Sequence, residues 1–185
     1  MIYFIAISAV ALLLFIWVIS VHRTLKAMDE NIFNAMSQIS IQLSSRWDTL
    51  TLLLELTKGY ADHECESLAQ NIQARRSITM DSTPEDISKQ ESMITEAVEK
   101  ITAIAENYPD LNEDNNYIKM INGVKQYENM LRVSRLIYND SVSKLNRTIH
   151  MFPTFLIAGA MGFKYRAYLE VAEEKANMPE ISSNK

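Results

Sequence analysis

Residues 2–21 read IYFIAISAVALLLFIWVISV, and this stretch decides how the rest of the chain is arranged. The run of 20 residues contains no charged residue, no Pro and no Gly. At ~1.5 Å per residue, a helix of this length crosses a hydrocarbon layer of ~30 Å. A lone segment in lipid must satisfy its own backbone hydrogen bonds, so only a helix fits. The run therefore predicts a transmembrane anchor at residues 1–22, which tethers the rest of the chain to a membrane.

A retained anchor fits this segment better than a cleaved signal peptide. Signal peptides carry basic residues before a shorter apolar stretch and small residues at a cleavage site. Here no Lys or Arg precedes the run, and Ser-Val-His-Arg follows it at residues 20–23. Arg23 and Lys26 come after the span, so the positive-inside rule favours a cytoplasmic position for the remaining chain. Asp29 and Glu30 lie close by, so this orientation rests on two charges.

Composition predicts an all-α domain of long helices. The chain has 18 Lys and Arg against 23 Asp and Glu, a net charge of −5 with no basic block, so no nucleic-acid partner is expected. Only 4 Gly and 4 Pro interrupt 185 residues. The single Cys65 excludes an internal disulfide. We expect one helical domain at residues 23–170, followed by a polar tail at 171–185 without fixed structure.

Apolar residues recur at steps of three and four in three stretches, as one face of a helix requires. The first stripe is Leu25, Met28, Ile32, Met36, Ile39, Leu43, Leu50, Leu53 and Thr57, with Arg46 or Trp47 filling one step. The second stripe, within residues 85–107, is Ile87, Ile94, Val98, Ile101 and Ile104. The third stripe is Ile118, Ile121, Val124, Tyr127, Leu131, Ser134, Tyr138, Val142, Leu145, Ile149 and Phe152.

These stripes predict an antiparallel up-and-down four-helix bundle with long first and last helices. The polar stretch at residues 60–78 supplies the second helix, and Gly59 ends the first. In the alternative, the first helix passes Gly59 unbroken to about Ile78, which leaves a three-helix body on one very long helix. In both arrangements the first stripe continues the phase of the apolar run, so the anchor leads straight into the bundle.

An ordered set of short motifs carries a resemblance to a known family. The motifs are ISIQLSSRWD at 39–48, KGYADHE at 58–64, Ala74-Arg75-Arg76, AENYPDL at 105–111, Glu128-Asn129, Arg135, Tyr138-Asn139, Asn146, Phe152-Pro153, Leu156-Ile157-Ala158 and Gly162-Phe163. In order and spacing the chain resembles the LemA family, from the anchor to about Glu170. One departure is Thr51-Leu52, where the family usually carries Pro-Asn. Because a Pro kinks a helix, its absence predicts a straighter first helix here.

The resemblance implies a bacterial protein of the cytoplasmic membrane, anchored once by its N-terminus and folded as an antiparallel helical bundle. It implies no established catalytic activity. Some relatives help to build or shape bacterial membrane compartments, and others are encoded near envelope proteins. Fold alone does not fix function. We therefore expect membrane lipid and an unidentified membrane or envelope protein as partners.

We predict no catalytic, cofactor-binding or metal-binding residues. His63 and Cys65 catch the eye, but two residues apart on a helix they point away from each other. The chain has neither the His-Glu-x-x-His of helical zinc proteases nor the Glu-x-x-His of di-iron bundles. Glu64 and Glu66 flank Cys65 and suppress its thiolate. A non-enzymatic protein with a solvated polar turn at this point is the expectation.

Charged residues at the phase of the core predict an ion pair between helices. Arg46 stands at a stripe position, and Glu128 borders the stripe residues Tyr127 and Leu131. A buried charge without a partner costs several kcal/mol. Our hypothesis is that Arg46 or Arg135 meets Glu128 across the bundle and fixes the helix register. The alternative is a ligand cleft formed by these residues with Asn129, Tyr138, Asn139 and Asn146.

Residues 151–163, MFPTFLIAGAMGF, are uncharged but too few to span a bilayer. They either pack on the end of the bundle as a hairpin or short helix, or lie on the membrane with Lys164 and Arg166 at lipid phosphates. Two functions follow. The first is a membrane-anchored, non-catalytic scaffold or adaptor. The alternative is a protein that binds or shapes lipid bilayers through the anchor and residues 151–163.

Self-association through the anchor stays open. Ala6, Ala9 and Ala11 are small enough for close helix packing, but no Gly-x-x-x-Gly is present. A homo-oligomer is therefore one possible state of the protein. The sequence favours neither a monomer nor an oligomer.

Overall fold

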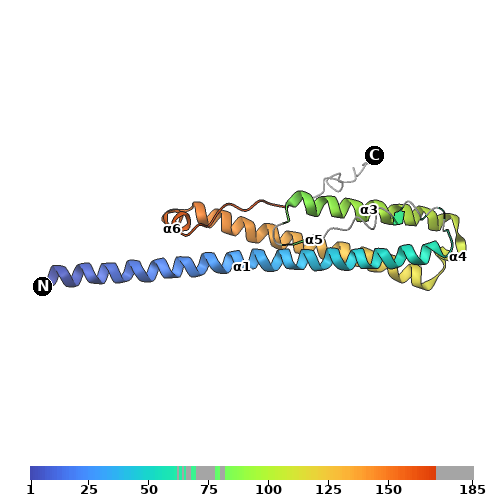
Figure 1. Ribbon diagram of the computed structural model, residues 1–185. Helices are drawn as coiled ribbons and strands as arrows, with labels where there is room; N and C mark the ends of the chain where they lie inside the picture. Colours follow the sequence, from blue (N-terminus) through green and yellow to red (C-terminus); the bar gives the residue numbers. More distant parts are fainter. Residues whose placement is uncertain (62, 64, 66–67, 70–77, 80–81, 170–185) are drawn as a thin grey trace, which may run out of the picture.

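The computed structural model describes residues 1–61, 63, 65, 68–69, 78–79 and 82–169 (Figure 1). Its helices are α1 (Ile2–Lys58), α3 (Pro84–Asn107), α4 (Pro109–Asn112), α5 (Asn115–His150) and α6 (Thr154–Ala160). No strand occurs among these residues, so the all-α prediction is confirmed. Most of the predicted second helix at 60–78, and the predicted tail at 171–185, lie outside the described residues.

Helix α1 is continuous over 57 residues, from the apolar run into the bundle. At ~1.5 Å per residue it is ~85 Å long. It passes Thr51 and Leu52 without interruption, as expected where the family Pro is missing. It ends at Lys58, because the Gly59 and Tyr60 amides donate to carbonyls three residues back, those of Leu56 and Thr57. The alternative of a first helix that runs unbroken past Gly59 is therefore wrong.

Local capping sets where α3 and α5 begin. The Thr83 hydroxyl accepts from the Asp86 amide at 3.2 Å, and the Asp86 carboxylate accepts from the Thr83 amide at 3.0 Å. This capping box, with Pro84 in the first turn, satisfies amides that have no partner inside the helix. Asp114 caps α5 without a capping box: its carboxylate accepts from the Asn116 amide at 2.6 Å.

Helices α1 and α3 run in the same direction (Figure 1). Helix α5 runs in the opposite direction and ends at the side of the bundle where α6 lies. The short α4 makes the turn from α3 to α5 at the end far from the N-terminus. Beyond α5, α6 packs against both α5 and α1. The chain thus comes back to α1 close to the apolar run, as the bundle prediction required.

The core follows the predicted stripes, with two corrections. All of the first stripe is buried or half-buried, and Arg46 and Trp47 are both buried. Ile118, predicted to face inward, is 42 % exposed, because Tyr117 takes the inward position in the first turn of α5. Phe152 is 80 % exposed, since α5 ends at His150 and the helical phase stops there.

The apolar run itself lies outside the core. Residues 1–16 are exposed along their whole length, whereas Trp17, Val18 and Val21 are half-buried. By length and composition this part of α1 is able to cross a membrane. The bundle therefore reaches α1 at about Trp17, a few residues before the apolar run ends.

Candidate functional site

A layer of charged side chains joins α1 to α5 inside the bundle. Arg46 of α1 is only 3 % exposed, and its guanidinium lies 3.2 Å from the Glu128 carboxylate of α5. The same guanidinium donates to the Thr95 hydroxyl of α3 at 3.5 Å. Burial lowers the pKa of Arg46, and the carboxylates of Glu128 and Glu91 oppose that change. The predicted pairing of Arg46 with Glu128 is confirmed.

Arg135 belongs to the same layer but takes a different partner. It forms an ion pair with Glu91 of α3 and does not meet Glu128. Glu91 was not singled out in the sequence, although it lies four residues before Thr95 and so on the same side of α3. Two arginines and two glutamates from α1, α3 and α5 thus balance one another in charge. The layer joins three helices through these contacts.

A strap of chain, residues 163–169, runs back along α5 without regular secondary structure. The Asn146 side-chain amide donates to the Arg166 carbonyl at 2.9 Å and accepts from the Arg166 amide at 3.0 Å. Asn139 does the same with Leu169, at 2.8 and 2.9 Å. An Asn side chain offers a donor and an acceptor side by side, so each pairs with the strap backbone as a strand would. Leu169 is buried against the core.

Tyr138 adds a third attachment to the strap. Its hydroxyl donates to the Ala167 carbonyl at 3.1 Å. Burial raises the pKa of Tyr138, and the nearby Arg166 partly opposes the rise. Three of the polar residues predicted for a possible ligand cleft, Tyr138, Asn139 and Asn146, therefore hold the chain's own backbone. Asn129 is exposed on the same helix.

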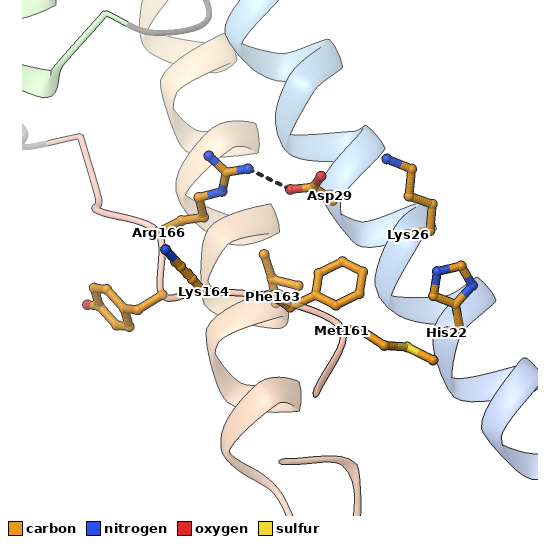
Figure 2. A pocket seen from close by; sticks show the side chains of 10 residues that line it. His22, Lys26, Asp29, Met161, Phe163, Lys164 and Arg166 are labelled. Carbon is orange, nitrogen blue, oxygen red and sulfur yellow. Dashed lines mark hydrogen bonds and ion pairs between the residues drawn. The ribbon is translucent and has the colours of Figure 1, made fainter. Parts of the chain in front are cut away.

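The strap and α1 enclose a cleft of about 590 Å³ at the end of the bundle nearest the apolar run. Figure 2 shows the side chains around it, with Phe163 and Met161 directed toward the side of α1 that carries His22. The ring centres of His22 and Phe163 lie 6.4 Å apart. The cleft is lined by His22, Lys26, Asp29, Leu145, Met161, Gly162, Phe163, Lys164, Tyr165 and Arg166.

The charges in this cleft are not balanced. Arg166 reaches across to α1, where its guanidinium lies 2.9 Å from the Asp29 carboxylate (Figure 2). Lys26 and Lys164 form no ion pair with any residue that the structure describes. Two ammonium groups therefore remain available in a cleft that Leu145, Met161 and Phe163 also line. Both Lys164 and Arg166 were expected at lipid phosphates. Arg166 instead pairs with Asp29, so of these two only Lys164 keeps a charge that is unpaired among the described residues for that role.

Exposed apolar side chains cover the same end of the bundle. Helix α6 buries Ala158, which confirms that the segment packs on the bundle end as a short helix. Met151, Phe152, Phe155 and Leu156 remain exposed beside it. This surface lies next to the part of α1 that enters the apolar run.

His63 and Cys65 do not form a site with each other, since His63 is exposed and Cys65 is buried in the core. Glu64 and Glu66 lie outside the described residues. Within the described part of the chain, no three His, Cys, Asp or Glu side chains come together as metal ligands. The absence of a cofactor and of catalysis stays a prediction.

Fold and surface together define a helical bundle built on one long helix, whose first part is apolar enough to cross a membrane. The chain belongs to the LemA family, whose sequence pattern matches residues 35–182. The resemblance drawn from the motifs is confirmed, and the match begins inside α1, after the apolar run. A search of curated proteins finds no match to the chain.

Proposed function

We propose that this protein is a membrane-anchored scaffold or adaptor without catalytic activity, carried once by the bacterial cytoplasmic membrane. The apolar run serves as the anchor, and Arg23 and Lys26 after it favour a cytoplasmic bundle. Because α1 is continuous, the bundle stands on the anchor without a flexible linker. A partner bound to the bundle is then held at a set height above the lipid.

The observation that carries this proposal is an apolar row on the outside of α5. Met130, Val133, Leu136 and Ile137 are all exposed, at spacings that place them within one side of the helix. Leu131, Ser134 and Tyr138 occupy the adjoining, buried side of the helix. Exposed apolar rows of this kind accept an amphipathic helix from another protein. We expect the partner to be a membrane or envelope protein.

Site-specific cross-linking in cells tests the scaffold. A photoreactive amino acid at Val133 or Ile137 is expected to give one discrete cross-linked product, which mass spectrometry identifies. Lys125, exposed on the same helix, is the matched control position. The same products from all three positions, or none from Val133 and Ile137, would contradict the proposal. A product that contains only this chain would identify a homo-oligomer instead.

A second candidate is a protein that acts on the bilayer itself. The observation that favours it is the set of exposed side chains Met151, Phe152, Phe155 and Leu156 beside the apolar run. The chain without residues 1–22 is then expected to bind anionic liposomes. Replacing Phe155 and Leu156 by Asp removes that binding, whereas Ile118→Asp, at an exposed site on the far end of the bundle, leaves it intact. Liposome flotation separates the two outcomes.

A further inference from the structure

The cleft between α1 and the strap lies at the depth of lipid headgroups when the apolar run spans a bilayer. The run ends at Val21, so the hydrocarbon boundary falls there. Headgroups add ~5–7 Å on each side, which corresponds to ~3–5 further helical residues. These are residues 22–26, and both His22 and Lys26 line the cleft. This placement rests on the anchoring part of the proposed function.

The burial pattern of α1 agrees with this depth. Trp17 and Val18 are half-buried although they belong to the apolar run, so the bundle end overlaps the run by ~6 Å. Interfacial helices insert their apolar faces by ~5–10 Å. The exposed Phe155 and Leu156 of α6 are the side chains placed to do so. The cleft then opens into the headgroup layer directly above them.

The local charge has the opposite sign to that of the whole chain. A second, shallower hollow on α1 adjoins the cleft and is lined by His22, Arg23, Lys26, Ala27 and Glu30. Taken together, the two linings hold four cationic side chains, Arg23, Lys26, Lys164 and Arg166, against the carboxylates of Asp29 and Glu30, which leaves +2. The chain as a whole carries −5. An anionic ligand is therefore attracted to this end of the bundle.

We propose that this cleft binds one anionic phospholipid of the surrounding leaflet. Lys26 on α1 and Lys164 on the strap supply the cations for its phosphate, and the side chains of Met161 and Phe163 contact the glycerol and upper acyl carbons. The Arg166–Asp29 ion pair ties the strap to α1 and so holds Lys164, two residues earlier, beside the cleft. A soluble phosphate has no acyl carbons to contact Met161 and Phe163, so the lipid is the ligand that matches both the charged and the apolar side chains of the lining.

The size and access of the cleft fit this ligand. A volume of about 590 Å³ suits a headgroup and not a whole lipid, so the acyl chains stay in the bilayer. A zwitterionic headgroup brings its own cation next to the two lysines, whereas a phosphatidylglycerol headgroup brings only the phosphate charge. The cleft therefore distinguishes anionic from zwitterionic lipid.

Native mass spectrometry of the full-length protein in detergent tests the proposal. The probes are phosphatidylglycerol and phosphatidylcholine with the same acyl chains, titrated in separate experiments. Wild type is expected to retain one phosphatidylglycerol in preference to phosphatidylcholine. A basic residue near a membrane surface contributes about fivefold in affinity, so Lys26→Gln with Lys164→Gln weakens phosphatidylglycerol binding roughly 25-fold. Phosphatidylcholine binding stays unchanged.

Matched variants distinguish the effect of charge at the cleft from the effect of the net charge of the whole chain. Lys119→Gln with Lys125→Gln makes the same change in net charge at exposed sites on the far half of α5, and is expected to leave lipid binding intact. Lys26→Arg with Lys164→Arg keeps the charge and is expected to retain binding. Circular dichroism establishes that each variant is folded. Equal weakening in both Gln pairs, or equal retention of the two lipids by wild type, would overturn the proposal.

Two further arms identify the source of any failure. Displacement of the lipid by excess inorganic phosphate would show a phosphate site and overturn the lipid assignment. Release of the full-length protein from membranes by alkaline carbonate would instead overturn the anchoring on which the depth argument rests. The cross-link at Val133 is measured independently, so failure of the scaffold and failure of the lipid site give different results.

Discussion

Arg46 and Glu128 lie 82 residues apart in the chain, yet their side chains meet at 3.2 Å between α1 and α5. The two partners differ in environment, since the Arg46 side chain is 3 % exposed and that of Glu128 is 44 % exposed. Water reaches the carboxylate, but it cannot reach the guanidinium. Loss of the partner is therefore expected to cost more free energy of folding when the arginine remains than when the glutamate remains.

This asymmetry predicts unequal effects of removing each partner. Glu128→Gln leaves a buried cation with less compensation and is expected to lower the free energy of unfolding by about 2–3 kcal/mol. Arg46→Met removes the buried charge and leaves a solvated carboxylate, for an expected loss of about 1 kcal/mol. Urea unfolding of the full-length protein in mild detergent, followed by circular dichroism, measures both. Equal losses, or a larger loss for Arg46→Met, would contradict the assignment.

The strap depends on two Asn side chains, which gives a local prediction. Asn146→Ala removes two hydrogen bonds to Arg166, worth about 2 kcal/mol together, so the Arg166 amide is expected to exchange its hydrogen roughly 30-fold faster. Asn139→Ala is expected to do the same at Leu169. Hydrogen exchange read by mass spectrometry resolves residues 163–169. Asn129→Ala, at an exposed position of α5, serves as the control and should leave exchange in the strap unchanged.

Tyr138 predicts a loss of stability at alkaline pH. Its pKa is raised in the folded chain, because burial disfavours the phenolate. Above the ordinary pKa of about 10 the unfolded chain gives up this proton first, so unfolding becomes easier as pH rises. The hydrogen bond to the Ala167 carbonyl also needs the proton. Tyr138→Phe is expected to be less stable than wild type at neutral pH and to lose less stability between pH 9 and 11.

Thermal unfolding across that pH range measures the difference. The control is Tyr127→Phe, at a half-buried tyrosine of the same helix. Among the described residues Tyr127 makes no hydrogen bond to the strap, so this variant is expected to lose stability with pH as wild type does. Parallel alkaline loss in all three proteins would assign the effect to groups other than Tyr138.

The position of α6 predicts contact with lipid. A nitroxide spin label at Phe155→Cys is expected to be accessible to oxygen and shielded from a water-soluble relaxation agent when the full-length protein is in bilayers. Cys65 is buried, so it does not compete for the label. A label at Ile118→Cys, on the far end of the bundle, is expected to show the opposite accessibility. Equal accessibility at the two sites would contradict insertion of α6.

Those parts of the fold that depend on periodicity were predictable. The apolar stripe of residues 25–57 keeps the phase of the apolar run, and α1 is indeed one helix. The predicted start of the third helix at about Glu85 differs from Pro84 by one residue, because a capping box marks it. Arg46 at a core position required a partner, and Glu128 borders the third stripe, so the pair was predictable.

The strap and the partner of Arg135 were not predictable in this way. The strap is extended, and its hydrogen bonds come from side chains 20–30 residues earlier, so no local repeat marks it. Glu91 is one of several acids on α3, and only the packing of α3 against α5 selects it. Ile118 and Phe152 were wrongly predicted to face the core. Both lie at the ends of the third stripe, where packing against α1 no longer decides which side chains point inward.

With the apolar run anchored in a bilayer as proposed, the continuity of α1 makes the bundle tilt as one rigid body about the lipid boundary. Beyond Val21 the helix extends for about 55 Å without a joint, so a tilt of about 10° moves its far end sideways by about 10 Å. A bilayer that becomes thinner or thicker changes the preferred tilt of a spanning helix. The same angle is then imposed on α3 and α5, which are bound to α1 through the charged layer. A small change in membrane thickness is thereby converted into a large displacement of whatever the outer end of the bundle holds.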